Sequence, residues 1–240
     1  MNIPWPRHAD GLPPGQGLLA TMPRFTDIPN RPPPDSSGPV ALEIRVEATT
    51  IARIGQAELD ALGPGEHIAD FHCVTTWSVT GVCWTGVPLR SVLASVGLLD
   101  APLPYLVARA ADRRHAAFVW DDVTAADVLL ATHLDGAPLG PRHGGPLRLV
   151  APQQYGYKSV KHLISLDLTA SEPRTKSKEH LRARVALEER HPSLPSWLLR
   201  VPYRLVIPPT AVIAERSLAR VADPATNAPR GPAVPARRAR

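Results

Sequence analysis

The sequence predicts an α+β fold in which the strands form antiparallel or mixed sheets. Strand-like and helix-like hydrophobic patterns are interspersed along the 240 residues without a regular strand–helix–strand rhythm. Neither a Gly-x-Gly-x-x-Gly fingerprint nor a phosphate-loop motif is present, so a nucleotide-binding Rossmann fold has little support. With 44% hydrophobic and 20% charged residues, the chain can bury a substantial core, which argues against global disorder.

We expect a single domain with an extended N-terminal arm. Residues 1–40 are rich in proline and glycine and include Pro32-Pro33-Pro34, which is typical of polyproline II, so this arm should wrap the body. Residues 41–170 form the body, and residues 171–221 are expected to be an extension that packs on it. Residues 222–240 are mostly Pro, Ala and Arg, a composition that predicts a disordered tail.

Hydrophobic patterns predict the strands of the body. Leu42, Ile44 and Val46 alternate with charged residues, a period of two that is typical of a half-buried strand. Apolar runs predict four more strands, over residues 68–74, 105–110, 147–151 and 160–168. The first of these four is expected to be buried and to carry Cys73.

Helices are predicted between these strands and in the extension. Four apolar residues recur at i, i+3, i+4 and i+7 and predict an amphipathic helix: Leu89, Val92, Leu93 and Val96. Further helices are predicted over residues 57–62, 125–133 and the highly charged 176–189, with a turn at Asp135-Gly136. The extension is expected to pack on the body through four apolar side chains, Leu187, Leu194, Trp197 and Leu198.

The charge of the chain gives little support to a nucleic-acid partner. The net charge is +5, but from Ala222 onward four arginines stand against a single aspartate, so the body is only mildly basic. A nucleic-acid-associated protein remains an alternative that rests only on the sequence pI of 9.6 and this arginine tail. The N-terminus resembles no signal peptide, and no apolar stretch approaches membrane-spanning length, so we expect a cytoplasmic protein without a membrane span.

Two cysteines, Cys73 and Cys83, are too few for a disulfide framework in a chain of this size. Each could be a small buried hydrophobic residue. They lack Cys-x-x-Cys spacing, and no paired histidines complete a set of four ligands, so a zinc site has little support. If Cys73 is a ligand, its thiolate suits a soft or highly charged metal.

A basic, glycine-rich segment indicates a pocket for an anion. His143, Arg148, Lys158 and Lys161 lie within residues 143–161, and glycines and prolines interrupt this segment repeatedly. Glycine lets the backbone approach a ligand closely, while lysine, arginine and free backbone N–H groups neutralise phosphate. A basic surface loop between two strands explains the same residues equally well, and the residues alone leave both interpretations open.

Three motifs carry a family resemblance. Cys73 precedes Thr76-Trp77-Ser78, the run Trp84-Thr85-Gly86-Val87-Pro88-Leu89 follows, and His143-Gly144-Gly145-Pro146-Leu147-Arg148 precedes Lys158-Ser159-Val160-Lys161. In this order, they resemble the molybdopterin-binding domain of the sulfite oxidase superfamily. That superfamily includes sulfite oxidases, plant-type nitrate reductases and the catalytic subunit of a bacterial methionine-sulfoxide reductase. The match covers residues 23–168 and implies the mixed-sheet molybdopterin-binding fold of that superfamily.

The resemblance implies a set of site residues. Cys73 occupies the place of the thiolate that ligates molybdenum, and is therefore the expected metal ligand and catalytic residue. The cofactor contacts that the resemblance implies are Asp112, His143, Arg148, Ser159, Val160 and Lys161. Arg113 and Arg114 either add positive charge to the pocket or form a solvated turn. Trp77 and Trp84 are either pocket walls or, more simply, core residues.

The resemblance also implies an activity. The expected cofactor is the molybdenum–molybdopterin cofactor, Mo-MPT, with no haem in this chain and a separate electron-transfer partner. The reaction would be a two-electron redox step or oxygen-atom transfer on a small substrate. Cys73 is followed by the uncharged residues Val74, Thr75, Thr76 and Trp77, which favours an S-oxide or N-oxide over sulfite. The alternative is a non-catalytic module that binds the pterin cofactor or another phosphorylated ligand.

Overall fold

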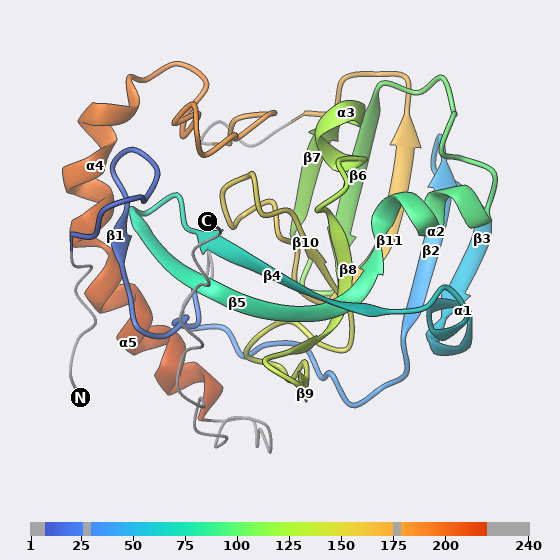
Figure 1. Ribbon diagram of the computed structural model, residues 1–240, viewed down its shortest axis with the longest axis horizontal. Coiled ribbons are helices and arrows are strands. Elements are labelled where there is room, and N and C mark those ends of the chain that lie inside the picture. Colours follow the sequence, from blue (N-terminus) through green and yellow to red (C-terminus); the bar gives the residue numbers. More distant parts are fainter. Residues whose placement is uncertain (1–7, 26–29, 175–178, 220–240) are drawn as a thin grey trace, which may run out of the picture.

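Two mixed β-sheets form the body of the protein, as the sequence predicts (Figure 1). The structure is a computed structural model that describes residues 8–25, 30–174 and 179–219. The strands are β1 Gly17–Leu18, β2 Ala41–Val46, β3 Thr49–Gly55, β4 Gly65–His72, β5 Trp77–Pro88, β6 Tyr105–Ala110, β7 His115–Val119, β8 Leu129–Leu134, β9 Ala137–Pro138, β10 Arg148–Val150 and β11 Leu163–Thr169. The helices are α1 Gln56–Ala61, α2 Leu89–Ser95, α3 Trp120–Val123, α4 Ser196–Leu205 and α5 Ile207–Leu218.

One sheet has the strand order β3-β2-β11-β6-β7. Its central pair, β2 and β11, is parallel, and its other pairs are antiparallel. The alternation predicted for β2 is confirmed, because Leu42 and Ile44 are completely buried. They join the main hydrophobic core, to which α2 contributes Leu89, Val92 and Leu93. The helix predicted from these three residues and Val96 is therefore also confirmed, and Val96 caps its C-terminal end.

The other sheet is built around the long strand β5. This strand pairs with β1 in parallel and with β4 and β8 in antiparallel register, and β8 continues the sheet to β9 and β10. The β5–β8 register shifts between Thr85 and Gly86. At Gly86 a Cβ atom would lie 2.3 Å from the carbonyl oxygen of Leu130, so only glycine fits this close approach.

The predictions for two further elements are confirmed, and that for β4 is only partly right. The strand over residues 105–110 and the short helix near residues 57–62 are confirmed as β6 and α1. The strand predicted over residues 68–74 starts earlier, at Gly65, and ends at His72, so that Cys73 follows it. The prediction that it is buried is wrong for Ile68, which is 78% exposed. The reason is that exposure alternates along the first part of β4, and Ile68 lies with Glu66 and Asp70 on the face that meets solvent.

Two predicted helices are wrong. Residues 129–134 form strand β8 instead of a helix, because β8 lies between β5 and β10 and its first three residues are buried on both faces. A short run of apolar residues has no periodicity that separates such a strand from a helix. The described part of the charged segment, residues 179–189, forms turns and one bridge, Gln154–Arg184, which ties it to the body.

The extension runs along the β1 end of the body as two consecutive helices, α4 and α5 (orange to red in Figure 1). Its predicted contacts are wrong, because Leu187, Leu194, Trp197 and Leu198 are 49–65% exposed. Buried contacts come instead from Ala183, Val185, Arg190, Ile207, Ala211, Ala214 and Leu218. The predicted tail, residues 222–240, lies outside the described residues. Among the described helices, none has the length and apolar character that a bilayer crossing requires.

Candidate functional site

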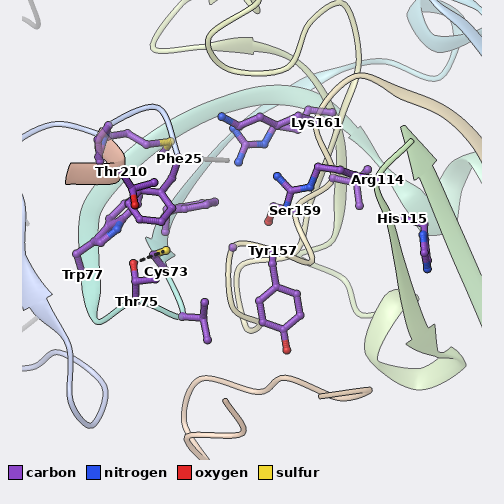
Figure 2. A pocket seen from close by; sticks show the side chains of 17 residues that line it. Phe25, Cys73, Thr75, Trp77, Arg114, His115, Tyr157, Ser159, Lys161 and Thr210 are labelled. Atoms are coloured by element: carbon purple, nitrogen blue, oxygen red, sulfur yellow. Dashed lines mark hydrogen bonds between the residues drawn. The ribbon is translucent and has the colours of Figure 1, made fainter. Parts of the chain in front are cut away.

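A cavity of about 240 Å³ opens beside Cys73, and we call it the Cys73 cavity (Figure 2). Segments far apart in the sequence line it: the N-terminal arm, the turn after β4, the start of β7, the loop between β10 and β11, and α5. Small-molecule sites usually enclose about 300–1,000 Å³, so this cavity lies just below that range. A small adjoining cavity, lined by Arg24, Asp112 and Lys161 among others, extends the same region.

Cys73 stands in a tight turn between β4 and β5. The Cys73 N–H donates to the Trp77 carbonyl over 2.8 Å, and the Thr76 N–H donates to the Cys73 carbonyl over 3.1 Å. Thr76 has a φ of 77°, in the left-handed region that β-branched residues rarely adopt. A conformation of this kind persists only where the surroundings hold it in place, and such residues cluster at functional sites.

The Cys73 thiol is free and buried. Its sulfur lies 3.1 Å from the hydroxyl oxygen of Thr75 (dashed in Figure 2). Burial raises the pKa of Cys73, whereas the hydrogen bonds from Thr75 and the charges of Arg190 and Arg114 act in the opposite direction. The thiol is therefore protonated at neutral pH, and a bound metal ion would displace the proton and take its place as the thiolate's counter-charge.

The end of the cavity near Cys73 is apolar and uncharged. Phe25, Trp77 and Thr210 lie around this end in Figure 2. Met22 and Phe71 also line the cavity and belong to the same hydrophobic cluster as Cys73 and Trp77. The Trp77 ring centroid lies 6.1 Å from that of Phe25 and 5.7 Å from that of Phe71. Trp77 is thus both a core residue and a pocket wall, whereas Trp84 lies in the core and does not line the cavity.

The opposite end of the cavity is cationic. Arg114 and Lys161 line it, and Figure 2 shows both across the cavity from Cys73. Arg148 also lines the cavity, but its guanidinium lies against the Phe71 ring of the apolar end. Burial lowers the pKa of Lys161 well below its usual value, and the charges of Arg148, Arg24, Arg114 and Arg142 add to this effect. Its ammonium group donates to the Arg142 carbonyl over 2.8 Å. Positive charges that depress each other's pKa in this way are stabilised by an anion.

Arg148 is the most deeply buried of these cations, at 1% exposure. Its guanidinium lies over the rings of Phe71 and Trp84, 5.2 Å and 4.9 Å from their centroids, and donates to the His143 carbonyl over 3.0 Å. Burial, and then the charge of Arg114, lowers the pKa of Arg148, yet a guanidinium stays protonated at neutral pH. Among the described residues, its buried Nε has no hydrogen-bond partner.

The structure brings together five of the predicted site residues. Cys73, Arg148, Ser159, Val160 and Lys161 all line the Cys73 cavity. The Ser159 hydroxyl accepts from the Ala151 N–H over 3.2 Å, which ties its loop to the residue after β10. Arg114 also lines the cavity, so of the two roles considered for it the structure supports a contribution of positive charge.

Three basic or acidic residues of the predicted segments lie elsewhere. His143 does not line the Cys73 cavity, and its backbone carbonyl accepts from Arg148. Asp112 lies in the small adjoining cavity and accepts from the Arg114 N–H over 3.1 Å. Lys158 points away, toward the Ala117 and Leu181 carbonyls, and burial lowers its pKa to about 7. Contacts of His143 and Asp112 with a cofactor stay predictions.

Sequence reasoning missed several residues that line the cavity. Met22 and Phe25 come from the arm, Phe71 from β4, and Thr210 from α5. The arm and α5 carry no pattern that points to a site, and only tertiary packing brings them to Cys73. Thr75 could have been singled out, because it lies two residues after Cys73 and its hydroxyl can reach the sulfur.

Comparison with known proteins gives the family. The family model described as the oxidoreductase molybdopterin binding domain matches residues 32–177. The protein-methionine-sulfoxide reductase catalytic subunit MsrP of Xanthomonas campestris is 33% identical over 139 residues, covering 50% of this chain and 43% of that protein. The uncharacterized oxidoreductase YuiH of Bacillus subtilis is 36% identical over 100 residues, covering 42% of this chain and 50% of that protein. The chain thus spans about half the length of these curated relatives or less.

Among solved structures, the sulfane dehydrogenase SoxCD of Paracoccus pantotrophus is similar. It is 21% identical, with a TM-score of 0.49 over 58% of this chain and 40% of that chain.

The residues present fit the cofactor of this family. Mo-MPT joins a metal held by sulfur ligands to a pterin with a phosphate, so it needs a soft ligand at one end and cations at the other. The Cys73 cavity has a thiol at one end and Arg114 and Lys161 at the other, with Arg148 also in its lining, and no carboxylate is among the described residues that line it. The family match over residues 32–177 and this arrangement agree: the chain belongs to the oxidoreductase molybdopterin-binding domain family.

Proposed function

We propose that this protein is a molybdenum enzyme in which Cys73 ligates the metal of Mo-MPT and the substrate is a neutral S-oxide. The observation that carries the proposal is the polarity of the Cys73 cavity, with a thiol and apolar walls at one end, Arg114 and Lys161 at the other, and Arg148 against the Phe71 ring. When bound, the cofactor supplies a molybdenum ion that exchanges two electrons and one oxygen atom with a substrate. The protein supplies ligation, orientation and charge.

The cations of the cavity have the role of holding the cofactor. Lys161, Arg148 and Arg114 neutralise its phosphate, and the loop that contains Ser159 and Val160 lies against it. The Arg148 Nε, which lacks a partner among the described residues, supplies one further donor. Because Arg148 is itself fixed between Phe71 and Trp84, it is an ordered donor that needs little rearrangement on binding.

The apolar end of the cavity selects the substrate. Met22, Phe25 and Trp77 offer no charge to a dianion such as sulfite, whereas they accommodate the alkyl groups of a thioether S-oxide. The cations at the other end are already engaged by the cofactor's phosphate in this proposal. The relatives named protein-methionine-sulfoxide reductase support an S-oxide. An N-oxide would meet the same apolar walls and is the second substrate to test.

We further propose that electrons come from a separate protein. Reduction of an S-oxide to a thioether consumes two electrons and two protons and releases water. The matching relative from Xanthomonas campestris is named a catalytic subunit, which supports an assembly with another component. Reduced dyes can replace such a partner in solution, so the reaction can be assayed without it.

The test is a steady-state assay of protein purified from a host that makes the pterin cofactor. A reduced viologen dye would serve as donor for dimethyl sulfoxide, methionine sulfoxide and trimethylamine N-oxide, and ferricyanide as acceptor for sulfite. We expect reduction of the S-oxides, loss of that activity in Cys73→Ser, and little sulfite oxidation. Sulfite oxidation without S-oxide reduction would contradict the substrate assignment, because it would require a cationic substrate end.

A further inference from the structure

The turn that carries Cys73 is held by side chains from the two ends of the described chain. Gln16, in the arm, donates from its side-chain amide to the Cys73 carbonyl over 3.2 Å. Arg190, in the extension, donates from its guanidinium to the Val74 carbonyl. These two carbonyls are consecutive in the turn, so the peptide groups on both sides of the Val74 Cα atom are fixed by residues far away in sequence.

Arg190 is integrated into the body at this point. Its side chain is completely buried, and its guanidinium lies over the Tyr155 ring, 4.7 Å from the centroid. Besides Val74, it donates to the Pro14 carbonyl and to the Glu188 carboxylate, each over 3.3 Å. A buried guanidinium is tolerated only when its donors are satisfied, so these bonds fix both its position and that of the Val74 carbonyl.

Gln16 is oriented by a chain of hydrogen bonds. Its amide oxygen accepts from the Ser78 hydroxyl over 3.2 Å, and the Ser78 oxygen lies 2.8 Å from Nδ1 of His72. Because the Ser78 proton is given to Gln16, Nδ1 of His72 must carry the proton that it donates to Ser78. The Gln16 amide nitrogen is then left to donate to the Cys73 carbonyl.

The turn needs such external support. Thr76 has a φ of 77°, an unfavourable conformation for a β-branched residue, and its side chain is fully buried. The arm also contributes the Gly17 N–H, which donates to the Thr76 carbonyl over 3.0 Å, and α4 contributes Arg204, which donates to the Thr76 hydroxyl over 3.4 Å. Strained residues stay in place when several neighbours fix them, as here.

We propose that Gln16 and Arg190 are positioning residues, which hold the backbone of the turn so that the Cys73 sulfur faces the cavity. The importance of this direction for catalysis rests on the proposed function of Cys73. The conclusion that Gln16 and Arg190 fix the backbone of the turn is independent of the proposed function, because every contact named is made within the protein. A ligand at a metal site is effective only when its own support fixes its direction.

The first experiment measures how tightly the turn is held in the cofactor-free protein. Cys83→Ser serves as the background, so that Cys73 is the only thiol, and its alkylation by iodoacetamide is followed by mass spectrometry. We expect Gln16→Met to raise the rate roughly three- to tenfold, the effect of one lost hydrogen bond. Arg190→Met also removes a charge that lowers the pKa of Cys73, so its rate is compared with that of the background at equal thiolate fraction, taken from the pH profile, and should rise at least as much. The matched controls are Gln154→Met, a buried glutamine, and Arg184→Met, an arginine of the extension paired with Glu189, and both should leave the rate unchanged.

The second experiment uses the cofactor-loaded protein and a spectrum that a loss of stability alone would not alter. The electron paramagnetic resonance spectrum of the Mo(V) state depends on how the cysteine sulfur is oriented toward the metal. We expect an altered spectrum in Gln16→Met and Arg190→Met, an intermediate one in Arg190→Lys, which keeps one donor, and an unaltered one in both controls. If Arg190→Met does not fold, Gln16→Met alone decides.

Unchanged alkylation rates together with unchanged spectra in both variants would overturn the positioning role. The two proposals fail in different ways. A wild-type protein that acquires no molybdenum in a competent host contradicts the proposed function, and its alkylation rates still report whether Gln16 and Arg190 hold the turn.

Discussion

The hydroxyl of Thr75 lies 3.1 Å from the Cys73 sulfur and is one of the groups that oppose the effect of burial on this thiol. Burial disfavours the thiolate and raises the pKa of Cys73, whereas a donated hydrogen bond favours the thiolate and lowers it. Removing the hydroxyl should therefore raise the pKa further.

We predict that Thr75→Val, which keeps the shape of the side chain, moves the pH profile of Cys73 alkylation to higher pH in the cofactor-free protein. The thiolate is the reacting form, so a higher pKa means slower reaction at a given pH. Thr50→Val, on the outer strand β3, should leave the profile in place. A shift to lower pH would mean that Thr75 accepts a hydrogen bond from the thiol.

Variants of the adjacent residues Arg113 and Arg114 test whether cofactor retention depends on the position of a positive charge or only on the net charge of the protein. Arg114 lines the Cys73 cavity and Arg113 does not. We predict that Arg114→Met lowers the amount of cofactor retained during purification about tenfold or more, since a charge-assisted hydrogen bond contributes about 1.5–3 kcal/mol. Arg113→Met removes the same charge and should retain wild-type pterin content. If both variants lost the same amount of cofactor, retention would depend on the net charge of the protein and not on a contact made by Arg114.

At the residue scale, the sequence predicts Cys73 and the cations of the cavity better than its apolar walls. Cys73, Arg148 and Lys161 belong to motifs in which residue type and spacing carry the signal, and all three line the cavity. Met22 and Thr210 are ordinary apolar or hydroxyl residues in segments without a motif. Their place beside Cys73 arises from tertiary packing, which no local pattern encodes.

At the element scale, Gly86 shows how closely β5 and β8 approach each other. We predict that Gly86→Ala destabilises the protein by about 1–3 kcal/mol or more, since the added methyl group would overlap the backbone of Leu130 and Ala131 and force strands apart. The matched control is Gly38→Ala, where a Cβ atom meets nothing within 4 Å. Urea unfolding of both variants checks the prediction, and equal midpoints would show that the strands can separate at no cost.

Clear periodicity identifies β2 and α2, whereas the apolar run of β8 does not distinguish a strand from a helix. The alternation in β2 and the i, i+3, i+4 pattern of α2 identify their structures because solvent and core impose the period directly. Strand β8 is buried on both faces over its first half, so its apolar run lacks a period and is equally typical of a helix.

The cytoplasmic location expected from the sequence stays a prediction.

At the scale of the whole molecule, α5 closes the site together with the arm. Glu215 of α5 pairs with Arg142 and accepts from the Arg24 backbone N–H over 3.3 Å, while the Arg24 side chain donates to the Ala214 carbonyl over 2.9 Å. These contacts join α5, the arm and the loop before β10. They also hold Thr210 of α5 at the cavity.

We predict that Glu215→Gln lowers the free energy of unfolding by about 1–2 kcal/mol, because it leaves Arg142 without a counter-charge beside other cations. The loss should be smaller in cofactor-loaded protein, where an anion compensates. The exposed Glu172→Gln is the control and should change stability by less than about 0.5 kcal/mol. Equal losses with and without cofactor would contradict an anionic ligand in this region.

X-ray absorption at the molybdenum edge would show whether Cys73 binds molybdenum, as we propose. Wild-type protein and Cys73→Ser would be purified from a host that makes the pterin cofactor, with metal content measured by plasma mass spectrometry. We predict about one molybdenum per wild-type chain and one sulfur neighbour fewer in whatever metal the variant retains. The same number of sulfur neighbours in both proteins, or no molybdenum in well-folded wild-type protein, would contradict the claim.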